Sequence, residues 1–157
     1  MKKGLIILSI LLVVTLLLTF TYVKTQSEQI RYYKTSFFSG AQDLIENYQF
    51  ILDFEKSYLK EQNSDKKKQM LENHINLLSL SENHSDSVKA LLYKQVNIDE
   101  FVELESKVRM EAGLFQSSSS DSQKQIHAKN LDEAIAKFNK FLDDGMKTND
   151  VCLSGSC

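Results

Sequence analysis

Residues 30–60, IRYYKTSFFSGAQDLIENYQFILDFEKSYLK, decide the fold class. Apolar residues recur in this stretch at steps of three and four, which is the repeat of one face of an α-helix. The members of this apolar stripe are Ile30, Tyr33, Phe37, Ala41, Leu44, Tyr48, Ile51 and Tyr58, and Glu55 is its one polar interruption. We therefore predict an amphipathic helix of about 35 residues that continues from the segment before it.

Aromatic residues are concentrated in the same helix. Of the thirteen Phe and Tyr residues outside residues 4–23, eight fall between residues 32 and 58. A bundle core accounts for most of them. The aromatic residues that lie off the apolar stripe are Tyr32, Phe38, Phe50 and Phe54. Because aromatic side chains are good anchors at protein interfaces, we predict an interaction surface among these four residues.

The segment that precedes this helix is apolar throughout. Residues 4–23 contain no charge, and fifteen of these twenty residues are Leu, Ile, Val, Phe or Tyr. At about 1.5 Å per residue such a helix is about 30 Å long, which matches the hydrocarbon core of a bilayer. A cleaved signal peptide is the alternative, but its apolar region is usually about 7 to 15 residues long and ends in small residues. We therefore expect a transmembrane signal-anchor helix over residues 4–23, in contact with the lipid bilayer.

Charges predict how the membrane divides the chain. Lys2 and Lys3 precede the apolar segment, and two lysines on so short a tail favour the cytoplasmic side. We expect residues 1–3 in the cytoplasm, an extracytoplasmic bundle over residues 24–145 and a flexible tail over residues 146–157. The chain is then a single-pass protein of the cell membrane, and its lysine-rich, proline-free composition suggests a bacterial source.

Turn signals divide the remainder of the chain into further helices. The sequence from Gln62 to Asp65 indicates a turn and a helix cap, and a helix over about residues 65–80 follows. Polar residues 81–87 interrupt the apolar pattern, which resumes at Val88 and continues to Phe115. Asn97 and Glu100 form a capping-box-like pair inside this third helix, so the helix can restart there.

The last helix has its own start and stop signals. Ser122 and Gln125 form a capping box, the apolar repeat extends to residue 144, and Gly145 is the expected end. Chains without proline favour long helices over sheets. The predicted fold class is therefore all-α, with a single N-terminal transmembrane helix followed by an antiparallel bundle of about four helices.

Neither a nucleic-acid surface nor a catalytic motif is recognisable. Residues 24–157 carry a formal charge of −4, which provides no basic groove for a phosphate backbone. The sequence contains no nucleophile elbow, no phosphate-binding glycine loop and no dinucleotide-binding motif. Acidic residues such as Glu105 and Asp132 are expected on solvated helix faces. We predict a protein that is not an enzyme, that has no catalytic residue and that binds neither a cofactor nor nucleic acid.

The three histidines, His74, His84 and His127, do not show the spacing of metal ligands on one helix face. His74 lies between Leu71 and Leu78 on an apolar stripe. We therefore predict a hydrogen-bonded core or boundary histidine at this position and no metal site.

Cys152 and Cys157 are the only cysteines. Because Gly155 lies between them, a local disulfide is geometrically easy, and an oxidising exterior favours it. A bridge between two protomers is the alternative. A redox catalyst needs a thiol of low pKa, usually in a Cys-x-x-Cys motif at a helix start, and this tail does not supply that feature.

Together these features predict a membrane-anchored, non-enzymatic protein whose extracytoplasmic bundle binds another envelope protein or itself. The first alternative is ligand sensing, because a long helix that emerges from a membrane span resembles the outer half of bacterial helical-bundle receptors. Such receptors return through the membrane to a signalling domain, whereas this sequence ends at Cys157, so signal output is expected to pass through a partner. The second alternative is an exported thiol-redox or metal-handling protein, for which replacement of both cysteines by serine is the test.

Overall fold

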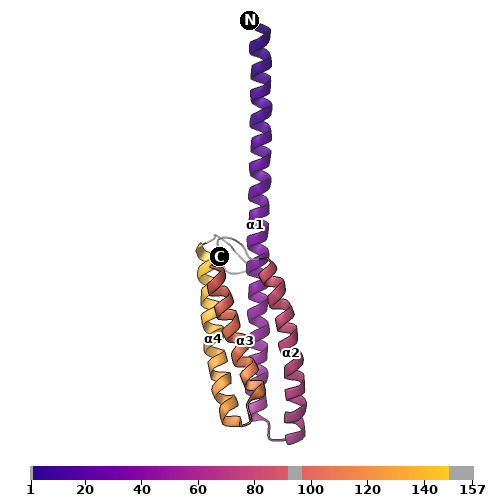
Figure 1. Ribbon diagram of the computed structural model, residues 1–157, viewed down its shortest axis with the longest axis vertical. Coiled ribbons are helices and arrows are strands. Elements are labelled where there is room, and N and C mark those ends of the chain that lie inside the picture. Colours follow the sequence, from indigo (N-terminus) through magenta and orange to yellow (C-terminus); the bar gives the residue numbers. More distant parts are fainter. Residues whose placement is uncertain (1, 92–96, 149–157) are drawn as a thin grey trace. The chain divides into compact units, whose positions relative to one another are not determined.

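The computed structural model describes residues 2–91 and 97–148, and for residues 2–10 it describes the backbone alone. This part of the chain contains helices and no strand. The helices are α1 (Lys2–Lys60), α2 (Ser64–Ala90), α3 (Ile98–Ser117) and α4 (Asp121–Thr148), as Figure 1 shows. For residues 2–91 and 97–148 the prediction of an all-α fold with four helices is confirmed.

The chain divides into two compact units, residues 1–34 and residues 35–157, and α1 contributes to both. In the first unit the large apolar side chains from Leu11 to Val23 are exposed. Among the described residues, no helix has the length and apolarity needed to cross a membrane. Residues 4–10 of the expected span lie outside the part whose side chains are described.

The second unit is a bundle in which neighbouring helices run in opposite directions. Asn47 of α1 lies against His84 of α2, whereas Glu55, farther along α1, lies against His74, nearer the start of α2. The contacts between α3 and α4 show the same reversal: Phe101 with Phe138, and Glu111 with His127. The predicted antiparallel packing is therefore confirmed for the bundle.

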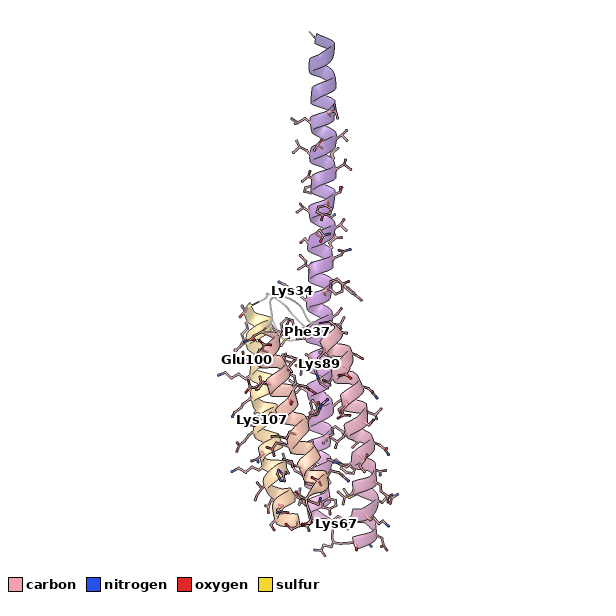
Figure 2. All side chains as sticks on the ribbon, in the orientation of Figure 1. Lys34, Phe37, Lys67, Lys89, Glu100 and Lys107 are labelled. Atoms are coloured by element: carbon pink, nitrogen blue, oxygen red, sulfur yellow. The ribbon has the colours of Figure 1, made fainter. Side chains whose placement is uncertain are left out.

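The apolar stripe of α1 forms the centre of the bundle core. Nine of the buried apolar residues of the described chain belong to α1, whereas α2 supplies only Val88. Phe37 and Lys67 lie at opposite ends of the bundle (Figure 2), and we name the two ends after them. At the Phe37 end, the ring of Phe101 lies 5.4 Å from that of Phe37 and 5.2 Å from that of Phe138, which is the spacing of favourable aromatic pairs.

Helix α2 continues through residues 81–87, so the predicted interruption there is wrong. Ser81 and Ser85 are buried and face the core, although the polarity of this segment reads as a turn. The Ser81 hydroxyl donates a hydrogen bond to the carbonyl oxygen of Leu77, which keeps its polar group satisfied inside the helix. Small side chains suit this seam, because a Cβ atom added at Gly40 of α1 would stand 3.1 Å from Cγ2 of Val88.

Two of the predicted helix caps are confirmed. The Asn63 side chain accepts hydrogen bonds from the backbone N–H groups of Asp65 and Lys66 at the start of α2. The Asn97 side chain accepts one from the N–H of Glu100, so α3 begins there and Val88 belongs to α2.

The predicted ends of the last helix need correction. Ser120, and not Ser122, accepts a hydrogen bond from the backbone N–H of Gln123, so α4 begins at Asp121. The helix then passes Gly145 and ends at Thr148. Gly145 serves packing at this position, because an added Cβ atom would stand 3.1 Å from the ring of Phe38.

Candidate functional site

Charged and polar side chains from all four helices are buried inside the bundle. Among the described polar residues, the buried ones with a titratable side chain are Glu55, His74, Glu105, Glu111 and Lys124, each of which is less than a tenth exposed. Glu105 corrects a prediction, since acidic residues of the bundle were expected on solvated faces. It lies four residues after Phe101 and three before Val108, which places all three on the core side of α3.

Glu105 is the centre of a polar cluster that we call the Glu105 layer, formed by Tyr48, Lys89, Glu105 and Arg109. The Tyr48 hydroxyl donates a hydrogen bond of 2.9 Å to one carboxylate oxygen of Glu105. Lys89 Nζ lies 3.1 Å from the other oxygen, and Arg109 Nε lies 3.8 Å from the first. Burial, reinforced by the negative charge of Glu105, raises the pKa of Tyr48. The phenol therefore stays a hydrogen-bond donor.

Glu55 of α1 and His74 of α2 form a second buried contact, which we call the Glu55 pair. Both side chains are fully buried, and Glu55 Oε1 lies 2.8 Å from His74 Nε2. Glu55 Oε2 meets no hydrogen-bond partner among the described residues. The prediction of a hydrogen-bonded core or boundary histidine at position 74 is confirmed.

Burial sets the protonation of this pair. Burial raises the pKa of Glu55 to about 9, against smaller opposing effects of Lys124 and His127. Burial also lowers the pKa of His74 to about 4, although the neighbouring Gln116 side chain favours the protonated ring. At neutral pH the carboxyl group therefore carries a proton, the imidazole is neutral, and the two side chains share one hydrogen bond between Oε1 and Nε2.

Lys124 is a buried cation whose charge lowers the pKa of Glu55, but its hydrogen bonds go elsewhere. Its Nζ donates to the carbonyl oxygens of Phe115 at 2.6 Å and of Gln116 at 3.5 Å, in the last turn of α3. A cation at a helix C-terminus is stabilised by the helix dipole. The same Nζ lies 5.0 Å from the ring centre of Phe115 and 5.5 Å from that of Tyr58. Lys124 therefore caps α3, and burial lowers its pKa.

Glu111 forms a further polar contact between α3 and α4. Its Oε2 lies 2.9 Å from Nδ1 of His127 and accepts a hydrogen bond of 3.3 Å from the Asn130 amide. A small hollow of about 150 Å³ adjoins it. The residues that line this hollow are Lys107, Glu111, Asn130, Glu133, Ala134 and Lys137.

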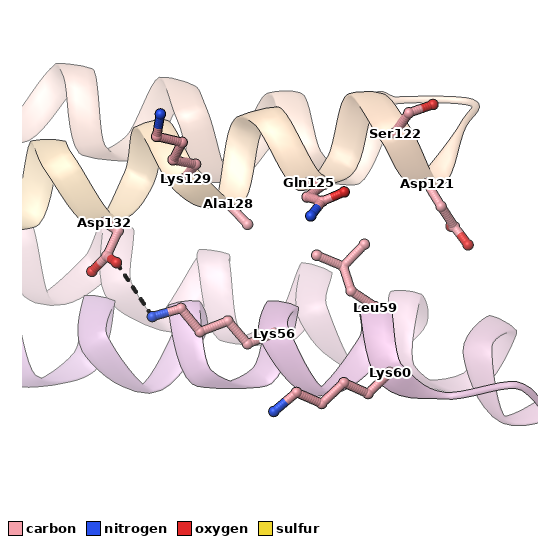
Figure 3. A pocket seen from close by; sticks show the side chains of 9 residues that line it. All are labelled: Lys56, Leu59, Lys60, Asp121, Ser122, Gln125, Ala128, Lys129 and Asp132. Atoms are coloured by element: carbon pink, nitrogen blue, oxygen red, sulfur yellow. Dashed lines mark hydrogen bonds and ion pairs between the residues drawn. The ribbon is translucent and has the colours of Figure 1, made fainter.

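A larger hollow of about 630 Å³ lies along the seam between α1 and α4 (Figure 3). Leu59 and Ala128 give it an apolar part, and the other lining residues are charged or polar: Lys56, Lys60, Asp121, Ser122, Gln125, Lys129 and Asp132. Lys56 Nζ lies 3.4 Å from Oδ2 of Asp132 across the seam. Because both signs of charge are mixed around an open groove, the lining does not select one class of ligand.

The buried cluster can hold and exchange a proton, but a substrate cannot reach it in this conformation. Glu55 and His74 are fully buried and line neither hollow. A carboxyl and an imidazole with strongly shifted pKa values are typical of catalytic sites only when they open into a cleft. In this conformation the Glu55 pair opens into neither of the two hollows.

The four aromatic residues predicted to form an interaction surface differ in exposure. Phe38 is 1% exposed and packs in the core, which removes it from that surface. Phe54 is half-buried, with its ring centre 6.1 Å from that of His74. Tyr32 and Phe50 are 69% and 59% exposed.

The predicted disulfide concerns Cys152 and Cys157, which lie outside the described residues. Within residues 2–91 and 97–148, no three His, Cys, Asp or Glu side chains are arranged to hold a metal ion. Comparison with known protein families, with curated proteins and with solved structures finds no match to this chain.

Sequence reasoning missed the Glu55 pair as a unit. Its signal was present, because Glu55 and His74 are each a polar residue on an otherwise apolar stripe. Two such interruptions on helices that share a core are expected to meet, since a buried polar group needs a hydrogen-bond partner. Which turn of α1 faces which turn of α2 is decided by the packing.

Proposed function

We propose that this chain is a membrane-anchored, non-enzymatic protein whose helical bundle lies outside the cytoplasm and binds another protein of the cell envelope. The exposure of the apolar part of α1 carries the proposal. Ten side chains between Leu11 and Val23 are Leu, Val, Phe or Tyr and are 47–68% exposed. A helix that is apolar all round needs either a protein core or a lipid environment around it.

The threonines of this segment support a lipid environment. The hydroxyl groups of Thr15, Thr19 and Thr21 donate to carbonyl oxygens of their own helix, at 2.8–3.0 Å. In hydrocarbon an unpaired donor costs several kcal/mol, so internal hydrogen bonds are the arrangement that a spanning helix needs.

A binding role, and not catalysis, is supported by the bundle itself. Its strongly perturbed groups are buried away from both hollows, whereas Phe50 is a large aromatic residue held in water on a helix surface. Exposed aromatic side chains on a packed scaffold are typical anchors for a protein partner.

Membrane insertion is tested by cell-free synthesis of the full chain with liposomes, followed by an alkaline wash and flotation. We expect the wild-type chain to float with the vesicles. A variant with both Leu12→Lys and Leu16→Lys should stay in the lysate, because each lysine near the bilayer centre costs about 2.5–3.5 kcal/mol.

The matched control is Ile126→Lys in α4, because Ile126 is 58% exposed, as Leu12 and Leu16 are at 60% and 61%. This variant should float like the wild type. Equal flotation of the double-lysine variant would contradict a spanning helix.

Orientation is tested by thiol labelling in intact cells, in a chain with Cys152→Ser and Cys157→Ser. A membrane-impermeant reagent should label a Ser119→Cys variant, since Ser119 is exposed at the Lys67 end of the bundle. A Lys2→Cys variant should react only after the cells are opened. The reverse pattern would place the bundle in the cytoplasm.

A further inference from the structure

The edge where α1 and α2 meet exposes apolar side chains in the middle of an otherwise polar surface. Phe50 of α1 is 59% exposed and Leu80 of α2 is 65% exposed. Phe54 and Leu77, one turn away on each helix, are partly buried, and Leu77 packs against the core. We call these four residues the Phe50–Leu80 edge.

The register of the two helices brings Phe50 and Leu80 to the same level. Asn47 Nδ2 lies 2.8 Å from His84 Nδ1, and Glu55 lies 2.8 Å from His74. The midpoint of these two contacts falls at residues 51 and 79. Because the helices are antiparallel, Phe50 therefore lies level with Leu80.

Both side chains also lie on the same flank of the seam. Phe50 follows Asn47 by three residues, and Leu80 precedes His84 by four, so each shares a helix face with one partner of the Asn47–His84 contact. That contact is exposed. Phe50 and Leu80 therefore lie at the same level and on the same flank of the seam between α1 and α2.

Around this edge the charge is negative. Residues 43–55 of α1 and residues 73–87 of α2 contain no lysine and no arginine. Asp43, Glu46 and Asp53 are exposed in this part of α1, and none of them has an ion pair among the described residues. An apolar centre with an acidic rim matches a partner that presents apolar side chains flanked by basic ones.

Charge also argues against other occupants. A second copy of this chain docked through the same edge would bring one acidic rim against another, and like charges across an interface are unfavourable. An anionic lipid surface is repelled for the same reason. The geometry points to a basic amphipathic helix of a partner protein, docked with its apolar face on Phe50 and Leu80 and its Lys or Arg side chains against Asp43, Glu46 and Asp53. This inference rests on the proposed function and names the surface through which it acts.

The test is photocrosslinking of the full-length chain in the cells that make it. A photoreactive phenylalanine analogue replaces Phe50 in one variant and Ile126 of α4 in a control, since the two side chains are about equally exposed at 59% and 58%. We expect the Phe50 variant to give an adduct with one other protein, and mass spectrometry to locate the link in a helical peptide of net positive charge. A self-linked dimer, a lipid adduct or a link to an acidic peptide overturns the inference.

Neutralising the rim tests the charge argument. In the photoreactive Phe50 chain, Asp43→Asn, Glu46→Gln and Asp53→Asn together should lower the adduct yield about tenfold, which is the size expected for three solvent-exposed charge contacts. Asp143→Asn with Asp144→Asn, on α4, is the control and should leave the yield unchanged. An unchanged yield in the triple variant overturns the basic partner.

The Ile126 control distinguishes failure of the Phe50–Leu80 edge from failure of the proposed function. If only the Ile126 variant gives an adduct with another protein, partner binding stands and the Phe50–Leu80 edge is wrong. If neither variant gives an adduct while the chain is in the membrane, both the edge and the proposed partner binding are overturned.

Discussion

The Glu105 layer and the Glu55 pair each bury a glutamate in one core, but the two glutamates have different partners. Glu105 accepts a hydrogen bond from the Tyr48 phenol and forms ion pairs with Lys89 and Arg109. These two cations remain 26% and 37% exposed. Glu55 has one imidazole as its hydrogen-bond partner, and both side chains are fully buried. Long cationic side chains from the surface reach the Glu105 carboxylate, whereas burial without such a contact raises the pKa of Glu55.

The largest effect is expected from removing the carboxylate of the Glu105 layer. Glu105→Ala should lower the free energy of unfolding by about 3 kcal/mol, because it leaves the buried Tyr48 hydroxyl without its acceptor, opens space in the core and removes the buried carboxylate beside Lys89 and Arg109. Urea denaturation of the full chain in detergent micelles measures it. Glu82→Ala, which removes a carboxylate that is 56% exposed and lies 3.9 Å from Arg109, is the control and should cost less than about 1 kcal/mol. Similar losses in both variants would contradict a special role for the buried layer.

The second effect is the pH dependence of stability that the Glu55 pair provides. The pKa of Glu55 is raised from 4.5 to about 9, so the folded state retains a proton that the unfolded chain releases, and stability is lost as the pH rises towards 9. The pKa of His74 is lowered from 6.5 to about 4, so stability is lost as the pH falls from 6.5 to 4. Between pH 4.5 and 6.5 the two effects are equal and opposite, so the free energy of unfolding does not change with pH.

Above pH 6.5 only the Glu55 effect remains, so the free energy of unfolding should fall by about 1.4 kcal/mol per pH unit, or about 3 kcal/mol by pH 9. Glu55→Gln supplies a neutral donor to His74 at every pH and should abolish this fall. Urea denaturation at pH 6.5 and pH 9 compares the two chains. A fall of the same size in the glutamine variant would show that another group is responsible.

A smaller effect is expected from removing Lys124, whose hydrogen bonds go to the end of α3 and not to Glu55. Lys124→Met should lower the free energy of unfolding by about 1–2 kcal/mol, because the last turn of α3 loses its cap and the helix dipole its counter-charge. The pKa of Glu55 should also rise further, since Lys124 opposes the effect of burial. Carbon-detected NMR titration follows the carboxyl group. Lys129→Met, at a side chain that is 78% exposed, should change neither quantity.

The smallest effect is expected for the ion pair in the groove of Figure 3. Lys56 and Asp132 are 45% and 56% exposed, so water already screens both charges. Lys56→Met should change the free energy of unfolding by no more than about 0.5 kcal/mol, measured as for the other variants. A loss as large as that of Glu105→Ala would mean that burial does not explain the contrast between the two polar clusters.

Much of the fold could be predicted from the sequence, because apolar repeats and caps are local signals. The stripe from Phe37 to Tyr58 is buried as predicted, and Asn63 and Asn97 cap the helices that follow them. The break predicted at residues 81–87 failed because Ser81 and Ser85 satisfy the helical repeat with small polar side chains. Hydropathy does not distinguish a serine that faces a close helix neighbour from one in a turn.

The candidate surface was predictable in part. Phe50 is exposed and Phe38 is buried, yet both lie off the same stripe in the sequence. The difference arises because α1 is surrounded by other helices on more than one side, so a second face of it is also covered. The acidic rim is a sequence feature, but its meeting with Leu80 depends on the register of α2.

The sequence by itself determined that the chain is helical and where most helices begin, because these properties depend on neighbours within a turn or two. It also shows directly that residues 4–23 are uncharged. Only the tertiary structure decided that Glu55 meets His74 and that Glu105 meets Tyr48 and Lys89. Each of these carboxyl groups is 16 to 57 residues away in the sequence from its partner on another helix. The charge of a buried carboxyl group depends on which distant side chains packing brings within about 4 Å, and no local pattern encodes that choice.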